Sequence, residues 1–221
     1  MAISALQRKN MVESQVRPSD VTDRRITSAM QDLARENFLP AAVANLAYMD
    51  EALAVAPGRS LMPPRAFAQL LQLASLEAGH NVLIVGALQG YSAAVMSRLA
   101  GKVLALESDS TAATAANAAL EQCGAHNVTV VSGPHIDGWP AAAPYDVIFV
   151  EGAVERVPDT LVAQLAPGGR LVTVEVSGKV GRAVVLQKSG RQGQEVVSKR
   201  VAFDASIPRL PGFEAPKTFA F

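Results

Sequence analysis

The stretch that ends at Glu107 constrains the fold of this chain more than any other. An apolar run at residues 82–85 stops at Gly86 and Gly90, a helical pattern of apolar residues follows, and a second apolar run at 103–106 leads to Glu107. This pattern predicts one βαβ unit, with a glycine turn after its first strand and an acid at the tip of its second. In an open parallel sheet such a unit binds nucleotide-like cofactors, because glycines let the backbone approach the ligand and a carboxylate accepts hydrogen bonds from ribose hydroxyls. The unit is therefore the first candidate for a functional site.

The chain after this unit alternates between strand and helix patterns. The further expected strands are 128–131, 145–150, 170–176, 182–187 and 195–203, with helices at 110–123 and 158–165. Strands that are apolar throughout are buried on both faces, which indicates an α/β fold with a parallel sheet covered by helices. The last two strands flank a polar turn that contains Gly190 and Gly193, and they are predicted to form an antiparallel hairpin. The tail that begins at Ile207 and includes Pro216 is predicted to be extended.

Residues 1–60 are predicted to be a helical extension that packs on a core formed by residues 61–221. The expected helices of the extension are 3–16, 21–37 and 41–48, and a loop marked by Pro57, Gly58, Pro63 and Pro64 is expected after them. Asp20 is the expected N-cap of the second helix. We expect the two parts to form one compact unit, and the N-terminal helices are the expected contact surface of a homo-oligomer.

The charge and composition of the chain exclude several classes of partner. Lys+Arg 20 balance Asp+Glu 20, so no broad basic field favours nucleic acid or an anionic membrane, and a small molecule or a protein is the expected partner. No apolar run approaches the roughly 20 residues that cross a bilayer, and the N-terminus lacks a signal-peptide pattern. The single cysteine, Cys123, cannot form an internal disulfide, so the cytoplasm is the expected location. No spacing of Cys, His and Asp predicts a metal site.

Short motifs follow one another from the N-terminal helices to the last parallel strand. They are Arg35-Glu36-Asn37-Phe38-Leu39-Pro40, Ala47-Tyr48-Met49-Asp50, Gly90-Tyr91-Ser92-Ala93-Ala94, Asp137-Gly138-Trp139, Ala143-Pro144-Tyr145-Asp146 and Leu165-Ala166-Pro167-Gly168-Gly169-Arg170-Leu171-Val172. In this ordered series the chain resembles the protein-L-isoaspartate O-methyltransferases over most of its length. A glycine loop alone is weak evidence, whereas the ordered series is specific at family level.

The resemblance implies a fold, a cofactor and a reaction. The implied fold is a Rossmann-like methyltransferase, with a seven-stranded, mostly parallel sheet, helices on both faces and a C-terminal antiparallel hairpin. The implied cofactor is S-adenosylmethionine, and the implied reaction methylates the carboxylate of isoaspartyl residues in a damaged protein or peptide. That carboxylate is already ionised at neutral pH, so the reaction needs little acid or base catalysis.

The resemblance places the donor site on the βαβ unit and on the end of the third strand. Glu107 matches the family's ribose-binding acid, and Gly86 and Gly90 match the outer glycines of its Gly-x-Gly-x-Gly loop. Leu88 replaces the central glycine, so a branched side chain is expected where backbone normally lies against the donor. Pro134 stands at the aspartate of a Gly-Asp-Gly segment and offers neither a carboxylate nor a backbone N–H. The expected cofactor-binding residues are Gly86, Ala87, Leu88, Gly90, Glu107, Gly133 and Pro134.

The resemblance also places a substrate pocket. The segment Leu61-Met62-Pro63-Pro64 aligns with the family's Ile-Ser-x-Pro, so Met62 stands at the serine that contacts the substrate. A thioether cannot donate a hydrogen bond to a carboxylate, so no catalytic residue is assigned, and Met62 is expected to pack in an apolar pocket. The expected substrate-pocket residues are Leu61, Met62, Pro64, Tyr91 and Glu151. His135 borders the expected adenine pocket and is predicted to be a surface residue.

Three functions are compatible with these residues. The first is a methyltransferase of this family. The second is a pseudoenzyme that keeps the fold as a binding or oligomerisation module, because substitutions fall at Met62, Leu88 and Pro134 while the scaffold motif at 167–169 is retained. A nicotinamide-dependent oxidoreductase is a distant third, since Leu88 and Tyr91 occupy positions at which its loop motif requires glycine or alanine.

Overall fold

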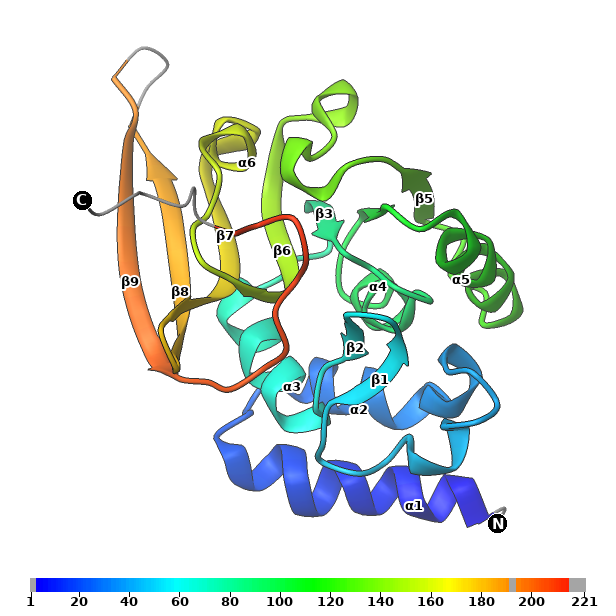
Figure 1. Ribbon diagram of the computed structural model, residues 1–221. Helices are drawn as coiled ribbons and strands as arrows, with labels where there is room; N and C mark the ends of the chain where they lie inside the picture. The colour runs from blue at the N-terminus through cyan, green and yellow to red at the C-terminus, as the bar shows by residue number, and fades with distance from the viewer. Residues whose placement is uncertain (1–2, 191–193, 215–221) are drawn as a thin grey trace, which may run out of the picture.

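A seven-stranded sheet forms the centre of the protein. The computed structural model describes residues 3–190 and 194–214. The strands of the sheet are β3 (Asn81–Val85), β4 (Lys102–Glu107), β5 (Val128–Ser132), β6 (Tyr145–Val154), β7 (Leu165–Ser177), β8 (Val180–Ser189) and β9 (Val196–Asp204). They lie in the order β5-β4-β3-β6-β7-β8-β9; β3 to β7 are parallel, and β8 and β9 are antiparallel to their neighbours (Figure 1). The predicted α/β sheet and its C-terminal hairpin are confirmed, and Gly193 lies outside the described residues.

Helices cover both faces of the sheet. They are α1 (Ile3–Met11), α2 (Arg24–Asp32), α3 (Pro64–Ala74), α4 (Tyr91–Ser97), α5 (Ser110–Gln122) and α6 (Asp159–Ala163). The face that carries Val82 and Ile84 packs against α3, α4, α5 and the N-terminal helices in one apolar cluster. The opposite face, which carries Leu83 and Val85, packs against α6 and the C-terminal tail. Successive residues of a strand point to opposite faces, so strands that are apolar throughout require cover on both sides.

The N-terminal segment begins its second helix later than predicted. α1 continues into a π-helical turn at Val12–Val16 and a 3-10 turn at Arg17–Ser19. Asp20 follows as the C-cap of this 3-10 turn, with a left-handed backbone at φ 63°, and is not the N-cap of α2. The N-cap of α2 is Asp23, whose carboxylate accepts the backbone N–H of Arg25 at 2.9 Å. A side-chain acceptor two residues ahead of an unpaired N–H is what a helix start requires.

The segment between α2 and α3 also differs from its prediction. The chain leaves α2 at Asp32 and forms two short 3-10 turns, at Arg35–Phe38 and Ala44–Leu46, where longer helices were expected. An antiparallel ribbon of β1 (Leu53–Ala56) and β2 (Arg59–Leu61) then replaces the expected loop. Gly58 permits the tight turn of this ribbon through its positive φ of 68°. The ribbon places Arg59 beside the loop that follows β3.

After β9 the chain returns across the ends of β7 and β6 as an extended segment, which we call the strap, residues 207–213 (Figure 1). The backbone N–H of Ala153 donates to the carbonyl of Pro208, and the N–H of Leu210 donates to the carbonyl of Ala153, each at 2.8 Å. Leu210 and Phe213 are buried in the apolar cluster of the second face. Since α6 has only five residues, the strap supplies part of the cover that this face needs. The predicted extended tail continues to Pro216, which lies outside the described residues.

Arg35 joins the N-terminal segment to the start of the core. Its buried side chain donates from Nε to the carbonyl of Ala47 at 2.9 Å and from Nη2 to the carbonyl of Met62 at 2.5 Å. Its guanidinium lies 4.6 Å from the centre of the Tyr91 ring, within the range of a cation–π interaction. Burial lowers the pKa of Arg35 from its ordinary value, and the interaction with Tyr91 opposes that change. The two parts of the chain share this buried cation, while a domain boundary at residue 60 stays a prediction.

Replacing Arg35 with alanine is expected to destabilise the fold by about 2–6 kcal/mol, because two buried carbonyls each lose a donor at about 1–3 kcal/mol. The measurement is the free energy of unfolding in urea. Arg65→Ala is the matched control, since the ion pair between Arg65 and Asp50 leaves the arginine side chain 58% exposed and such pairs contribute roughly 0–1 kcal/mol. Equal unfolding midpoints for the two variants would contradict this account of Arg35.

Candidate functional site

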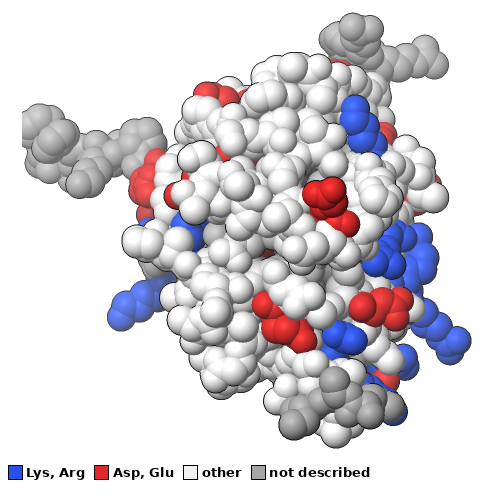
Figure 2. Space-filling model, turned by 90° about the vertical axis from the view of Figure 1, so that its right-hand side faces the viewer, with Lys and Arg blue, Asp and Glu red and all other residues white. Residues whose placement is uncertain are grey.

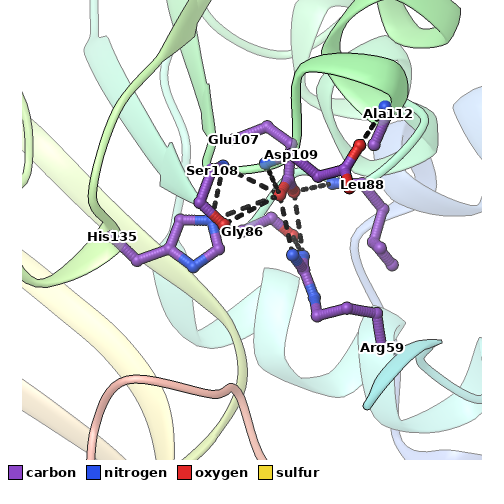
Figure 3. A network of polar contacts seen from close by, with 8 residues as sticks. All are labelled: Arg59, Gly86, Leu88, Glu107, Ser108, Asp109, Ala112 and His135. Carbon is purple, nitrogen blue, oxygen red and sulfur yellow. Dashed lines mark hydrogen bonds and ion pairs between the residues drawn. The ribbon is translucent and has the colours of Figure 1, made fainter. Parts of the chain in front are cut away.

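Glu107, the last residue of β4, is the centre of a buried polar network (Figure 3). Arg59 binds its carboxylate with two nitrogens, Nη1 to Oε1 at 2.7 Å and Nη2 to Oε2 at 2.9 Å. The backbone N–H groups of Leu88, Ser108 and Asp109 donate to the same carboxylate at 2.8, 2.8 and 3.0 Å. The Glu107 side chain is 0% exposed and that of Arg59 is 11% exposed. An anion is therefore held inside the protein by one cation and three backbone donors.

The charge of Glu107 is stabilised by its partners and not by water. Burial by itself raises the pKa of this carboxyl, because it penalises the charged form. The contact with His135 and the hydrogen bonds and positive charge of Arg59 outweigh burial and hold the pKa of Glu107 well below its usual range. Glu107 is consequently an anion at neutral pH. Arg59 is its counter-ion, and removing either partner would leave an uncompensated buried charge.

His135 lies against the same carboxylate, which corrects the surface position predicted from the sequence. It is buried, its Nε2 lies 3.4 Å from Glu107 Oε1, and Nε2 accepts the N–H of Ser108 at 3.1 Å. The parallel register of β4 and β5, which pairs Glu107 with Ser132, explains this position. His135 follows β5 by a few residues, so both side chains lie at the same edge of the sheet.

Glu107 also shapes the loop between β3 and α4. Gly86 and Leu88 both have positive φ, 85° and 50°; glycine adopts this conformation freely, whereas a leucine loses about 1–2 kcal/mol in it. The N–H of Leu88 points toward Glu107, and its side chain points away (Figure 3). That side chain is buried in the apolar cluster on the α4 face. The side chain is therefore part of the core, while the position of Leu88 relative to a donor stays a prediction.

Gly86 is covered by residues from two distant parts of the chain. A Cβ atom added to Gly86 would lie 2.9 Å from Leu210 Cδ1 and 3.4 Å from Arg59 Nη2. Arg59 Nη2 also donates to the carbonyl of Gly86 at 3.0 Å. At Gly152 in β6, an added Cβ would lie 2.8 Å from Leu210 Cβ. Leu210 thus packs directly on the loop that the sequence predicts to approach a cofactor.

The other residues predicted to bind a cofactor lie around this centre. Ala87 is buried within the loop, and Gly133 is half-buried after β5. Gly90 faces α5, where an added Cβ would lie 3.2 Å from Leu120 Cδ1. Pro134 is exposed. Gly90 therefore permits close packing of α4 on α5, and Pro134 lies at the surface.

Most residues predicted for the substrate pocket lie in the apolar interior. Leu61, Met62, Pro64 and Tyr91 are all buried. Met62 is 1% exposed and belongs to the apolar cluster of the α4 face, and its carbonyl is held by Arg35. At Met62 the backbone carbonyl therefore forms the hydrogen bond, while the side chain packs among apolar residues.

Glu151, the remaining pocket residue, is a second buried acid. It lies in β6 where the register with β7 slips between Phe149 and Ala153. Its side chain is buried, and the hydroxyl of Ser92 on α4 donates a hydrogen bond to its Oε2. Burial raises the pKa of Glu151 to about 7, against the Ser92 hydrogen bond and the charges of Arg59 and Arg35. Close to neutral pH this carboxyl therefore exists in both protonated and ionised forms.

Sequence reasoning missed two residues of the site, Arg59 and Leu210. Arg59 follows a Pro-Gly pair in a segment predicted to be a loop, and Leu210 lies between prolines in the tail. Both residues contact parts of the site that lie far from them in the sequence. The Pro57-Gly58 pair could have indicated a hairpin turn, but no local signal indicated its partner.

Two further classes of site are not found in the described part of the chain. Among residues 3–190 and 194–214, no cluster of His, Cys, Asp or Glu side chains is arranged to hold a metal ion, and no helix is both long and apolar enough to span a membrane. On the face shown in Figure 2, acidic and basic side chains are interspersed among uncharged residues. That face therefore carries no field of one sign.

Solved structures share this fold. One, a protein-L-isoaspartate O-methyltransferase, superposes with a TM-score of 0.80 at 26% identity, over 93% of this chain and 66% of that chain. A second, from Plasmodium falciparum and in complex with S-adenosyl-L-homocysteine, superposes with a TM-score of 0.77 at 18% identity, over 92% of this chain and 97% of that chain. The fold is that of a Rossmann-like methyltransferase.

Sequence comparison defines the family. The family model for protein-L-isoaspartate(D-aspartate) O-methyltransferase matches residues 6–206. Protein-L-isoaspartate O-methyltransferase 1 of Rhodopseudomonas palustris strain HaA2 is 40% identical over 168 residues, which are 76% of this chain and 69% of the relative. Protein-L-isoaspartate O-methyltransferase of R. palustris strain CGA009 is 41% identical over 162 residues, 73% of this chain and 74% of the relative. The chain belongs to the protein-L-isoaspartate O-methyltransferase family, which confirms the predicted resemblance, and nothing in these comparisons favours the pseudoenzyme alternative.

The raised pKa of Glu151 predicts a pH dependence of stability. The folded state binds this proton more tightly than the unfolded state, so stability falls as pH rises from about 4.5 to about 7 and then levels. The loss is on the order of 3 kcal/mol at 1.36 kcal/mol per pKa unit. The lowered pKa of Glu107 has the opposite effect: its contribution to stability is lost as pH falls, and this happens below the range of the Glu151 effect. In Glu151→Gln this loss is expected to disappear, as measured by urea unfolding from pH 5 to 8; parallel curves for the wild type and the variant would refute the assignment.

Proposed function

We propose that this chain transfers a methyl group from S-adenosylmethionine to the carboxylate of an isoaspartyl residue in a protein or peptide. The observation that carries the proposal is the family match over residues 6–206. The Rhodopseudomonas relatives are named for this activity, and the Plasmodium neighbour holds S-adenosyl-L-homocysteine. That molecule is the donor after it has lost its methyl group.

The proposed reaction requires positioning more than acid or base catalysis. S-adenosylmethionine supplies a methyl group that its sulfonium already activates, and a substrate carboxylate is ionised at neutral pH. The protein would therefore act by aligning the two reactants and by excluding water.

The donor side of the site is assigned to the end of β4. Glu107 is an anion at the tip of the second strand of the βαβ unit, beside the loop at Gly86. A carboxylate in this place is suited to accept hydrogen bonds from ribose hydroxyls. Gly86, Ala87, Leu88, Gly90, Gly133 and Pro134 remain the proposed surroundings of the donor.

The conformation of the site does not fit the donor as it stands. Both carboxylate oxygens of Glu107 are bound by Arg59 and by backbone N–H groups, and Leu210 covers Gly86. A ribose and Arg59 would compete for the same oxygens. Donor binding therefore requires a change in this arrangement.

The acceptor side is assigned to the residues predicted for the substrate pocket, Leu61, Met62, Pro64, Tyr91 and Glu151. They form a mainly apolar set, in which Glu151 can donate a hydrogen bond to a carboxylate only while it is protonated. At a pKa of about 7 this form is substantial at neutral pH. The proposed acceptor is a protein; a homo-oligomer through the N-terminal helices and a cytoplasmic location stay predictions.

The proposed activity is tested with S-adenosylmethionine that carries a labelled methyl group and with two synthetic peptides of one sequence, one containing L-isoaspartate and the other L-aspartate. We expect a base-labile methyl ester on the isoaspartyl peptide alone. Label on neither peptide, or equal label on both, would contradict the proposed function.

Variants of two acids separate the donor site from general effects of charge. Glu107→Gln is expected to lower kcat/KM by roughly 10- to 100-fold, because hydrogen bonds to a charged group contribute about 1.5–3 kcal/mol. Glu121→Gln changes an exposed acid on α5 and is expected to leave the rate unchanged. Thermal unfolding of both variants controls for loss of the fold.

A further inference from the structure

Two segments that lie far apart in the sequence, the β1–β2 ribbon and the strap, meet over the loop that follows β3. Leu210 of the strap approaches the Cβ position of Gly86 from one part of the chain, and Arg59 of the β1–β2 ribbon approaches it from another. Arg59 Nη2 is also hydrogen-bonded to the Gly86 carbonyl at 3.0 Å. The surface of the loop that a cofactor would need to approach is thus covered by the protein itself.

The hydrogen-bonding capacity of Glu107 is filled. Oε1 accepts from Arg59, Ser108 and Asp109, and Oε2 accepts from Arg59 and Leu88. A carboxylate offers about four lone-pair sites, and five N–H donors already converge here. The two nitrogens of the Arg59 guanidinium present a pair of donors, as two neighbouring ribose hydroxyls would. Arg59 and a ribose therefore exclude one another.

The strap is attached to the sheet by two backbone hydrogen bonds, an ion pair and two buried side chains. It forms an isolated bridge with β6 at Ala153, whose N–H donates to the carbonyl of Pro208 and whose carbonyl accepts the N–H of Leu210. Arg209 forms an ion pair with Glu155, in which the arginine side chain is 52% exposed, and exposed pairs contribute little. Its main anchors are the buried side chains of Leu210 and Phe213. All seven strands of the sheet lie outside the strap.

We propose that the strap and Arg59 together close the donor site, so that S-adenosylmethionine or S-adenosylhomocysteine binds only when Leu210 leaves Gly86 and Arg59 releases Glu107. This proposal rests on the proposed function and adds a regulatory state to the same site. The apparent affinity for the donor is then the intrinsic affinity multiplied by the fraction of molecules in the open state. A change that weakens the closed state strengthens donor binding.

The proposal is tested by calorimetric titration of S-adenosylhomocysteine into the full chain and two variants. Leu210→Ala removes most of the side chain that covers Gly86, and Arg59→Gln removes the cation from Glu107. Each variant is expected to bind at least about tenfold more tightly than the wild type, since each shifts the population toward the open state. Leu210→Ala keeps the test decisive if Arg59→Gln does not fold.

Matched controls separate opening from general destabilisation. Leu186→Ala removes a buried leucine of the same apolar cluster on β8, and Arg65→Gln changes an exposed arginine. Both are expected to bind as the wild type does. Equal affinity in the wild type, Leu210→Ala and Arg59→Gln would overturn the closed site and leave methyl transfer intact. Tighter binding in both variants, with no methylation of the isoaspartyl peptide by any form, would support the closed site and overturn the proposed function.

Discussion

The buried pair of Glu107 and Arg59 is the interaction on which the rest of the site depends. A carboxylate at the end of a central strand cannot remain ionised in the interior unless cations and N–H donors replace water. Here the replacement fixes several segments at once: the Gly86 to Leu88 turn, the start of the segment after β4, and the β1–β2 ribbon. The pair therefore sets the conformation of the loop as well as the charge of the site.

On the second face of the sheet, the same contacts affect the stability of the fold and access to the proposed donor site. One face is covered by α3, α4 and α5, on which the N-terminal helices pack, and the other by the short helix α6 together with the strap. A segment that completes a hydrophobic core contributes stability only while it stays in place, and Leu210 makes that contribution directly over Gly86. The same contact thus supports the fold and limits approach to Glu107. A protein with the fold of this family can therefore have a closed donor site, because the proposed closure depends on a few contacts of the strap and Arg59.

The sequence predicts the parts of the structure that depend on local pattern. The strands ending at Val85 and Glu107 are recognisable because they are apolar throughout and are followed by turns, and the position of Glu107 follows from them. The parts that it does not predict depend on contacts between distant segments. Arg59, Leu210 and the burial of His135 arise from the sheet register and the returning tail, which leave no periodic signal. Leu88 stands in the sequence where the family loop has glycine, and the sequence does not show that its positive φ directs the side chain into the core.

Hydrogen exchange of the Leu210 backbone amide, followed by NMR with and without saturating S-adenosylhomocysteine, tests the central claim most directly. In the closed state this N–H donates to the carbonyl of Ala153 at 2.8 Å, so its exchange reports whether the strap is in place. The account predicts that bound S-adenosylhomocysteine removes this protection, while amides in the centre of β6 remain protected. Bound ligand with unchanged protection at Leu210 would show that the donor and the strap occupy the site together, which would contradict the account.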